Sequence, residues 1–247
     1  MVRYKAIIAY DGTNFSGFQS QINGRTVQDE LEKTLSKIAN QKIKINGSGR
    51  TDAGVHALGQ VIDFAWPVKR PLEKLRFALD TQTSADIAVK QIELVEDSFH
   101  SRYLAKEKTY EFRVDIGKAR SPFRRFYSSY YRYELDLGRI RRALPDFLGS
   151  HDFTSFCSIK SEVNNKKRTI YEAKMEVNDT GDELLFTFRG DGFLYNMVRI
   201  MVGTLLKIGN GRISEDAIPQ IIAACDRSLA GPTAHPEGLY LKEVKYE

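Results

Sequence analysis

The sequence RYKAIIAY at residues 3–10 and the sequence TVQDELEKTLSKI at residues 26–38 set the architecture of the first part of the chain. Apolar and polar residues alternate in the first stretch, which predicts a strand. In the second stretch apolar residues recur at helical spacing: Val27, Leu31, Leu35 and Ile38. Thr26 precedes them as a predicted N-cap. A strand is therefore followed by an amphipathic helix.

The same kind of pattern continues along the chain and then repeats. Further strands are expected at 43–45, 55–66 and 87–95, with a helix at 72–79. From Lys108 onward we expect strands at 108–114, 170–177, 183–188 and 239–244, and helices at 137–148 and 194–208. Each set has the order βαββαβ, which is that of a ferredoxin-like unit. The sequence thus predicts an α+β protein of two ferredoxin-like halves, residues 1–102 and 103–247, with mainly antiparallel sheets.

Composition excludes several classes of protein. None of the apolar stretches approaches the roughly 20 residues of a membrane span, and residues 1–10 lack the pattern of a signal peptide. Cys157 and Cys225 lie too far apart in sequence for a CxxC motif, and the four histidines show no metal-ligand spacing. We expect a cytoplasmic protein with no membrane partner, no metal and reduced cysteines.

The positive charge is concentrated in one region. The chain has a net charge of +5, from 37 Lys and Arg against 32 Asp and Glu. Residues 102–142 hold 12 of the basic and 5 of the acidic residues, so this segment alone carries +7. Arginines, among them Arg124 and Arg125, alternate there with phenylalanines and tyrosines, as in RNA-binding surfaces. The alternative is a solvated face above packed aromatic residues.

The most distinctive segment reads GSGRTDAGVHA at residues 47–57. One carboxylate, Asp52, and one guanidinium, Arg50, stand among small residues that let a ligand approach the backbone closely. The spacing matches neither a P-loop nor a dinucleotide-binding fingerprint. From the residues alone, Asp52 is either a reactive carboxylate or the cap of a turn.

Two residues of the second half also attract attention. Arg199 lies in an otherwise apolar helical stretch, so its charge needs a partner; Asp52 is one candidate, and a structural ion pair with another acid is the alternative. Tyr110 opens a predicted strand, where most tyrosines only pack.

Several blocks of the sequence together resemble the TruA family of tRNA pseudouridine synthases. They are YDGTNFSGFQ at 10–19, GRTDAGVHALGQV at 49–61, FHSR at 99–102, DFTSF at 152–156, MVRIMVG at 197–203 and EGLYL at 237–241. The resemblance runs in order from residue 3 to the end of the chain. A region around 233–236 departs from the family pattern, which is often richer in proline there.

The resemblance implies a function and roles for individual residues. It implies isomerisation of uridine to pseudouridine at positions 38, 39 and 40 in the anticodon arm of tRNA, without a cofactor. It also implies a fold whose two ferredoxin-like halves join around a central cleft, and a homodimer in which one tRNA contacts both subunits. Asp52 would be the essential carboxylate and Arg199 its partner. Tyr110 would stack on the target uracil, and Arg50 would hold the extruded nucleotide.

Alternatives remain at this point. The carboxylate could remove the C2′ proton or attack C1′ or C6. An RNA-binding module without activity would need the basic segment but not Asp52. A thiol hydrolase would use Cys157 and His151, although no orienting acid is evident beside them.

Overall fold

The computed structural model describes residues 1–247. The chain folds into two compact units. The first unit comprises residues 1–106 and 240–247, and the second comprises residues 107–239. The predicted halves were 1–102 and 103–247, so the structure differs at two places. Residues 103–106 belong to the first unit, and the chain returns to that unit for its last eight residues.

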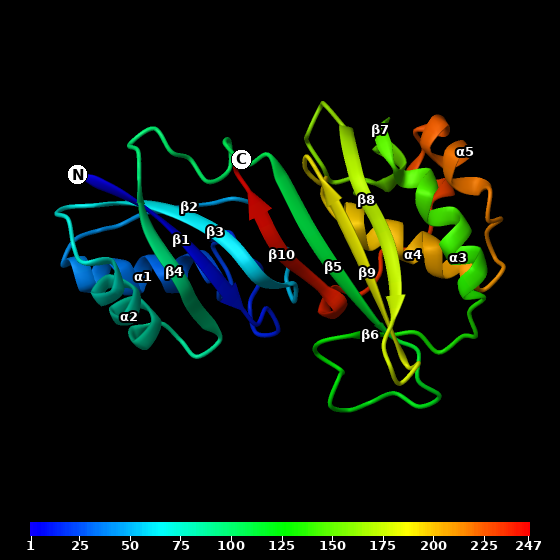
Figure 1. The fold of residues 1–247 in the computed structure, drawn as a ribbon, viewed down its shortest axis with the longest axis horizontal. Coiled ribbons are helices and arrows are strands. Elements are labelled where there is room, and N and C mark those ends of the chain that lie inside the picture. The colour runs from blue at the N-terminus through cyan, green and yellow to red at the C-terminus, as the bar shows by residue number, and fades with distance from the viewer. The chain divides into compact units, whose positions relative to one another are not determined.

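The first unit contains the predicted ferredoxin-like arrangement. Its elements are β1 (Val2–Tyr10), α1 (Val27–Ala39), β2 (Ile45–Gly47), β3 (His56–Trp66), α2 (Leu72–Gln82) and β4 (Ile87–Val95) (Figure 1). The strands lie in the order β4-β1-β3-β2, and all these pairings are antiparallel. At the other end of β3, the C-terminal strand β10 (Leu239–Lys245) runs parallel to it, with Tyr240 opposite His56.

One face of this sheet forms the core of the unit. Alternate residues of β1 are buried: Tyr4, Ala6, Ile8 and Tyr10. Helix α1 buries Val27, Leu31 and Leu35, as its spacing predicted. The predicted cap is confirmed, because the Thr26 side chain accepts a hydrogen bond from the Asp29 amide at 3.2 Å.

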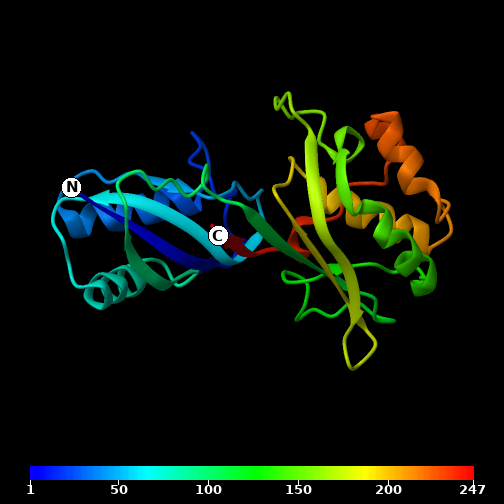
Figure 2. The same cartoon turned by 45° about the horizontal axis from the view of Figure 1, so that its top comes forward.

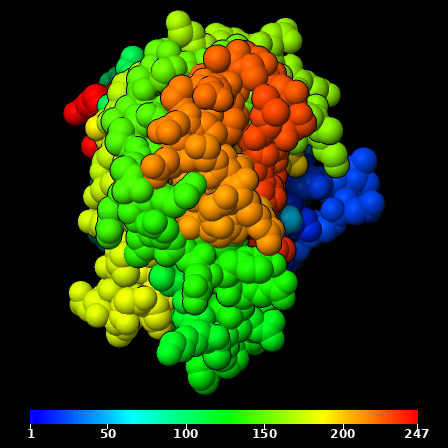
Figure 3. All heavy atoms as spheres, turned by 90° about the vertical axis from the view of Figure 1, so that its right-hand side faces the viewer, coloured from blue at the N-terminus to red at the C-terminus, as the bar shows by residue number.

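The second unit places three helices on one side of its sheet (Figure 1). Its elements are β5 (Glu107–Asp115), β6 (Ser129–Tyr130), α3 (Leu137–Ala143), β7 (Gly149–Asp152), β8 (Lys167–Val177), β9 (Glu183–Gly190), α4 (Met197–Gly209) and α5 (Ala217–Ala224). The strand order is β5-β9-β8-β7, antiparallel throughout, and β6 adds to β5 in parallel. Figure 3 views the side that carries α3 in green and α5 in orange to red.

Differences from the predicted elements of this unit have local causes. The helix expected at 137–148 ends at Ala143, because Pro145 belongs to a following 3₁₀ turn at 144–147. Helix α4 begins at Met197 rather than 194, since Asn196 has a left-handed backbone with φ 63°. Strands β6 and β7 and helix α5 were not predicted.

Helix α4 is the buried element of this unit. All but two of its residues, Arg199 and Lys207, are buried. At Gly203 an added Cβ would lie 1.8 Å from the Pro232 carbonyl oxygen, so the segment after α5 crosses this helix at backbone contact. The α+β class with mainly antiparallel strands is confirmed, and none of the helices has the length and apolar character required to cross a membrane.

Candidate active-site loop and its surroundings

The segment that carries Asp52 is the loop between β2 and β3, and its first residues are tied to β3. Ser48 Oγ donates to Gln60 Oε1 at 2.5 Å, and Gln60 Nε2 donates to the Gly49 carbonyl at 2.9 Å. Ser48 and Gln60 are fully buried. Because both polar side chains are satisfied by each other and by the loop, the entry of the loop has a defined path.

The segment at residues 10–19 supports the same loop from behind. The Phe18 amide donates to the Thr51 carbonyl at 3.1 Å, and the Gly54 amide donates to the Phe15 carbonyl at 3.3 Å. These two bonds lie on either side of Asp52. The block YDGTNFSGFQ, singled out earlier without a role, therefore holds the backbone around the candidate carboxylate.

Tyr10 and Gly12 add two close contacts to this support. The hydroxyls of Tyr10 and Thr51 are 2.7 Å apart, and burial raises the pKa of Tyr10 to about 12, although its hydrogen bonds to Thr51 and Gln60 work in the opposite direction. At Gly12 an added Cβ would lie 2.0 Å from the Val55 carbonyl oxygen. Glycine at this position permits the two loops to pack backbone against backbone.

Asp52 itself is half-buried and stands at the start of a turn. The Val55 amide donates to the Asp52 carbonyl at 3.1 Å, so the turn is closed by the backbone. This geometry accounts for the small residues Ala53 and Gly54, the second of which has φ 76°.

His56 ends the loop and has a structural role that sequence reasoning missed. Its ring is buried, Nδ1 accepts a hydrogen bond from the Gly12 amide at 3.0 Å and lies 3.2 Å from Asp11 Oδ1. The ring also stacks on Tyr240 at a centroid distance of 4.7 Å. His56 thus joins the loop, the segment at 10–19 and β10 within the first unit.

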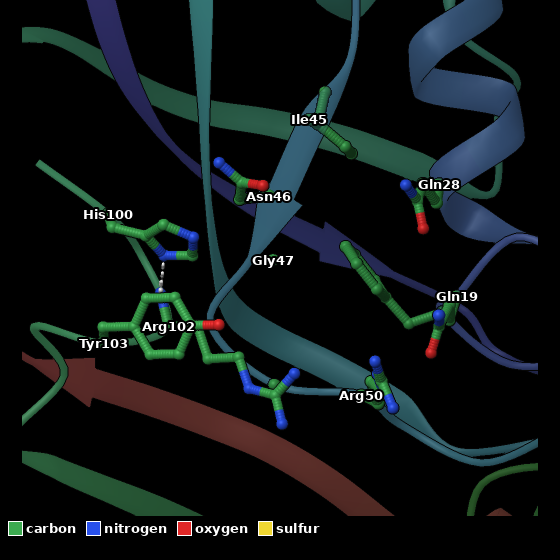
Figure 4. A pocket seen from close by; sticks show the side chains of 11 residues that line it. Gln19, Gln28, Ile45, Asn46, Gly47, Arg50, His100, Arg102 and Tyr103 are labelled. Carbon is green, nitrogen blue, oxygen red and sulfur yellow. Dashed lines mark hydrogen bonds between the residues drawn. The ribbon is translucent and has the colours of Figure 1, made fainter.

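Arg50 lies on the exposed side of the loop and lines a cavity of about 190 Å³ (Figure 4). The cavity is lined from one side by the loop and β2, and from another by the segment that follows β4. Its lining residues include Gln19, Asn46, Arg50, His100, Arg102 and Tyr103. No acidic side chain lines it. The sequence pattern did not predict this cavity, although FHSR at 99–102 supplies part of its wall.

In the second unit, Tyr110 and Arg199 each have defined neighbours. Tyr110 is buried in β5, and its ring packs edge-on against Phe193 at 5.0 Å between centroids. The Arg199 guanidinium donates through Nε to the Ala234 carbonyl at 2.7 Å and through Nη1 to Asn196 Oδ1 at 2.9 Å. Two groups of the second unit thus orient this side chain on α4.

In the basic segment, which was predicted to contact RNA, one of the two arginines is paired within the protein. Arg124 forms an ion pair with Asp182 at 3.1 Å and lies 3.9 Å from Asp115. The Ile116 amide donates to the Asp182 carbonyl at 2.9 Å, so this loop is held against the β8–β9 turn, and Figure 2 shows the two segments at the same end of the sheet. Hydrogen bonds from Thr180, Asn178 and Arg124 lower the pKa of Asp182. Much of the charge of Arg124 is therefore compensated within the protein.

Arg125 remains on the exposed side of this segment. Its guanidinium lies 4.2 Å from the centroid of the Phe126 ring and donates to the Pro122 carbonyl. The neighbouring Phe123 is 89% exposed. Of the two arginines predicted to contact RNA, Arg125 has the more accessible charge.

The thiol-hydrolase alternative finds no support in this geometry. Cys157 is buried and directs its thiol to the Ser158 carbonyl, whereas His151 Nε2 lies 2.7 Å from the Leu148 carbonyl. No hydrogen bond joins the two side chains. No group of three or more His, Cys, Asp or Glu residues is arranged to hold a metal ion.

Comparison with known proteins defines the class of this chain. The sequence pattern of the family described as tRNA pseudouridine synthase matches residues 6–104 and 143–247. This class consists of isomerases that act on uridine in tRNA. The proteins called tRNA pseudouridine synthase A from Streptococcus mutans and Streptococcus suis are each 56% identical over 248 residues, and that from Streptococcus sanguinis is 55% identical. All three alignments cover the whole of both chains. The chain belongs to the tRNA pseudouridine synthase family.

Solved structures give a more distant likeness. A chain from an archaeal box H/ACA Nop10–Cbf5 complex is 14% identical, with a TM-score of 0.38. The match covers 94% of this chain and 59% of that one.

Proposed function

We propose that this protein converts uridine to pseudouridine at positions 38, 39 and 40 in the anticodon arm of tRNA, with Asp52 as the essential carboxylate. The observation that carries the proposal is the loop at 47–57. It contains a single carboxylate, half-buried and flanked by backbone bonds to the segment at 10–19. The full-length identity to proteins named tRNA pseudouridine synthase A supports the same substrate.

The chemistry explains why one carboxylate suffices. Pseudouridine formation breaks the bond from N1 to C1′, turns the uracil and joins C5 to C1′, while a proton leaves C5 and one is gained at N1. No atom is added and no electron is lost, so the reaction needs neither cofactor nor metal. A carboxylate acts in it either as a base at C2′ or as a nucleophile at C1′ or C6, and every route requires its ionised form.

The remaining residues prepare this step. We propose that Arg199 pairs with Asp52 and keeps it ionised, because a nearby positive charge favours the carboxylate. Its bonds to Ala234 and Asn196 hold the guanidinium in a defined position on α4. Tyr110 offers an aromatic ring for the flipped uracil, and the exposed Arg50 holds the extruded nucleotide.

Oligomeric state and tRNA binding are also part of the proposed function. We propose that the protein acts in the cytoplasm as a homodimer that grips the tRNA backbone through its basic segments, Arg125 among them. Arg124 contributes by holding the loop that presents Arg125. Such contacts give affinity without reading the base sequence.

The direct test is modification of an unmodified tRNA transcript by the purified protein. We expect pseudouridine at one or more of positions 38–40, mapped by chemical labelling, with no change in the mass of the RNA. A protein that binds the transcript but leaves these positions as uridine would be a binding module and would contradict the proposal.

A further inference from the structure

The cavity beside Arg50 carries an uncompensated positive charge. Three other arginines of the first unit pair with carboxylates: Arg3 with Asp63, Arg25 with Glu30 and Asp86, and Arg76 with Glu73. By contrast, the side chains of Arg50 and Arg102 make no hydrogen bond or ion pair in the structure, and both line the cavity. The positive electrostatic potential is therefore high in this cavity, because it contains two unpaired guanidinium groups and no acidic side chain lines it.

The segment that carries Arg102 is firmly anchored. The Ser101 amide donates to Asp63 Oδ1 at 2.8 Å, and Ser101 Oγ donates to the Asn46 carbonyl at 3.0 Å. Tyr246 donates its hydroxyl to the Ser101 carbonyl at 2.7 Å. Asp63 is fully buried and also pairs with Arg3. Because the residue before Arg102 is held by three bonds, the backbone position of Arg102 is defined before any ligand binds.

The neighbouring aromatic residues complete the wall. His100 Nδ1 accepts a hydrogen bond from the Arg102 amide at 3.1 Å, so in the neutral ring the proton is on Nε2 and can be donated. The His100 ring supports Tyr103 at 4.2 Å between centroids, yet Tyr103 is 76% exposed. An exposed ring beside unpaired arginines offers a face on which a nucleobase can stack.

The size of the cavity fits a small anionic group. Its volume of about 190 Å³ suits a phosphodiester with part of a ribose but not a duplex. Figure 4 shows the Arg102 side chain extending toward Arg50, with Gln19 beyond it. Arg50 is two residues from Asp52, a span of at most about 7 Å along the backbone.

We propose that this cavity is a phosphodiester-binding subsite for the RNA strand that carries the target uridine. Arg102 binds the phosphate one or two nucleotides from that uridine, and Arg50 extends the positive charge of the cavity toward the extruded nucleotide. The base of the adjoining nucleotide stacks on Tyr103. The inference rests on the proposed function for its substrate. Arg102, His100 and Tyr103 thereby join the proposed RNA-binding residues, and they favour an extended single strand next to the extruded base.

The first experiment measures binding of an anticodon stem-loop RNA at several salt concentrations. Relative to wild type, Arg102→Gln should raise the Kd about tenfold, as expected for the loss of a charge-assisted hydrogen bond. It should also lower the slope of log affinity against log salt by roughly 0.7 to 0.9. The matched control is Arg76→Gln, which removes the same charge from an arginine paired with Glu73 and outside the cavity. Equal slopes for wild type and Arg102→Gln, with a native circular dichroism spectrum, overturn the proposal.

A second experiment determines which phosphate of the RNA Arg102 binds. Stem-loops with one neutral methylphosphonate linkage, moved stepwise past the target uridine, are bound to wild type and to Arg102→Gln. At one linkage within two nucleotides of the uridine, the two losses should not add, because both remove the same contact. Additive losses at every linkage contradict the subsite even if Arg102→Gln weakens binding.

The aromatic part of the subsite has its own pair of variants. Tyr103→Ala should weaken binding roughly fivefold or more, whereas Tyr103→Phe should bind like wild type, because stacking needs the ring and not the hydroxyl. Equal affinity of Tyr103→Ala and wild type removes the stacking role. Pseudouridine mapping with wild type separates this question from the proposed function. Conversion with unchanged salt slopes refutes only the subsite, and altered slopes without any conversion refute only the proposed function.

Discussion

The hydroxyl of Tyr10 lies 2.7 Å from the hydroxyl of Thr51, the residue immediately before Asp52. Tyr10 ends the first strand and Thr51 stands in the loop between β2 and β3, so a buried hydrogen bond connects the core of the first unit with its candidate catalytic loop. Burial also raises the pKa of Tyr10 to about 12. This relationship leads to the first prediction.

Tyr10 should make the protein sensitive to alkaline pH. In the unfolded chain a tyrosine loses its proton near pH 10, whereas in the folded protein Tyr10 keeps it to about 12. Between pH 10 and about 12, the unfolded state therefore binds fewer protons than the folded state. The contribution of Tyr10 to the free energy of unfolding is complete below pH 10 and is lost as the pH rises to about 12. The loss should be on the order of 2 kcal/mol in the free energy of unfolding.

The variant that checks this is Tyr10→Phe. We expect it to lose about 1 kcal/mol at neutral pH, from the missing hydrogen bond, and to show a smaller decline of stability above pH 10 in urea titrations. Tyr103→Phe, at an exposed tyrosine, is the control. An identical alkaline decline in Tyr10→Phe and wild type would refute the assignment.

Asp52→Asn should abolish conversion of uridine while leaving tRNA affinity nearly unchanged, since affinity comes mainly from phosphate contacts. Single-turnover assays should give less than about a hundredth of the wild-type rate. Asp97→Asn, at an exposed position of the same unit, controls for the loss of one negative charge. A residual rate well above that limit would mean that Asp52 is not the essential group.

Arg199→Met should impair turnover more than folding. The side chain is oriented by the Ala234 carbonyl and Asn196 Oδ1, yet it is not fully buried, so methionine can occupy its place on α4. We expect the rate to fall about 100-fold, as when one charge-stabilising donor is removed from an active site. A protein that melts far below wild type but is fully active per folded molecule would identify Arg199 as a purely structural residue.

Arg124 and Arg125 should respond differently to neutralisation. Arg124→Gln removes the ion pair with Asp182 and should lower the melting temperature, because the loop loses one of its attachments to the β8–β9 turn. Arg125→Gln should leave the melting temperature unchanged and lower the salt slope of tRNA binding by roughly 0.7 to 0.9. If neither variant changes that slope, this segment does not contact RNA.

Gly12→Ala should destabilise the loop that carries Asp52. The new Cβ would lie 2.0 Å from the Val55 carbonyl oxygen, a distance that requires the backbones to separate. Overpacking of this kind typically costs about 1 to 3 kcal/mol. Gly181→Ala is a control for loss of a glycine, since an added Cβ there meets nothing within 4 Å, although its φ of 73° adds backbone strain. Urea titration and single-turnover rates should show both a less stable and a slower Gly12→Ala protein.

The sequence alone determined the order of the elements from β1 to β4 in the first unit, and it marked the Asp52 loop. Periodicity reports which residues of a segment face a core, so the strand at Val2–Tyr10 and the helix at Val27–Ala39 were predicted within a residue or two, as was the Thr26 cap. These are local properties. The small residues around Asp52 likewise marked an unusual loop without reference to any other part of the chain.

Only the tertiary structure decided which distant groups meet. Nothing near Arg124 in the sequence indicates that Asp182 neutralises it, and nothing near Leu239–Lys245 indicates that this strand pairs with β3 of the first unit. The cavity beside Arg50 likewise depends on Asp63 and Tyr246 holding Ser101 in place. The physical reason is that periodicity records the burial of a residue but not the identity of its partner, and charge compensation depends on that partner.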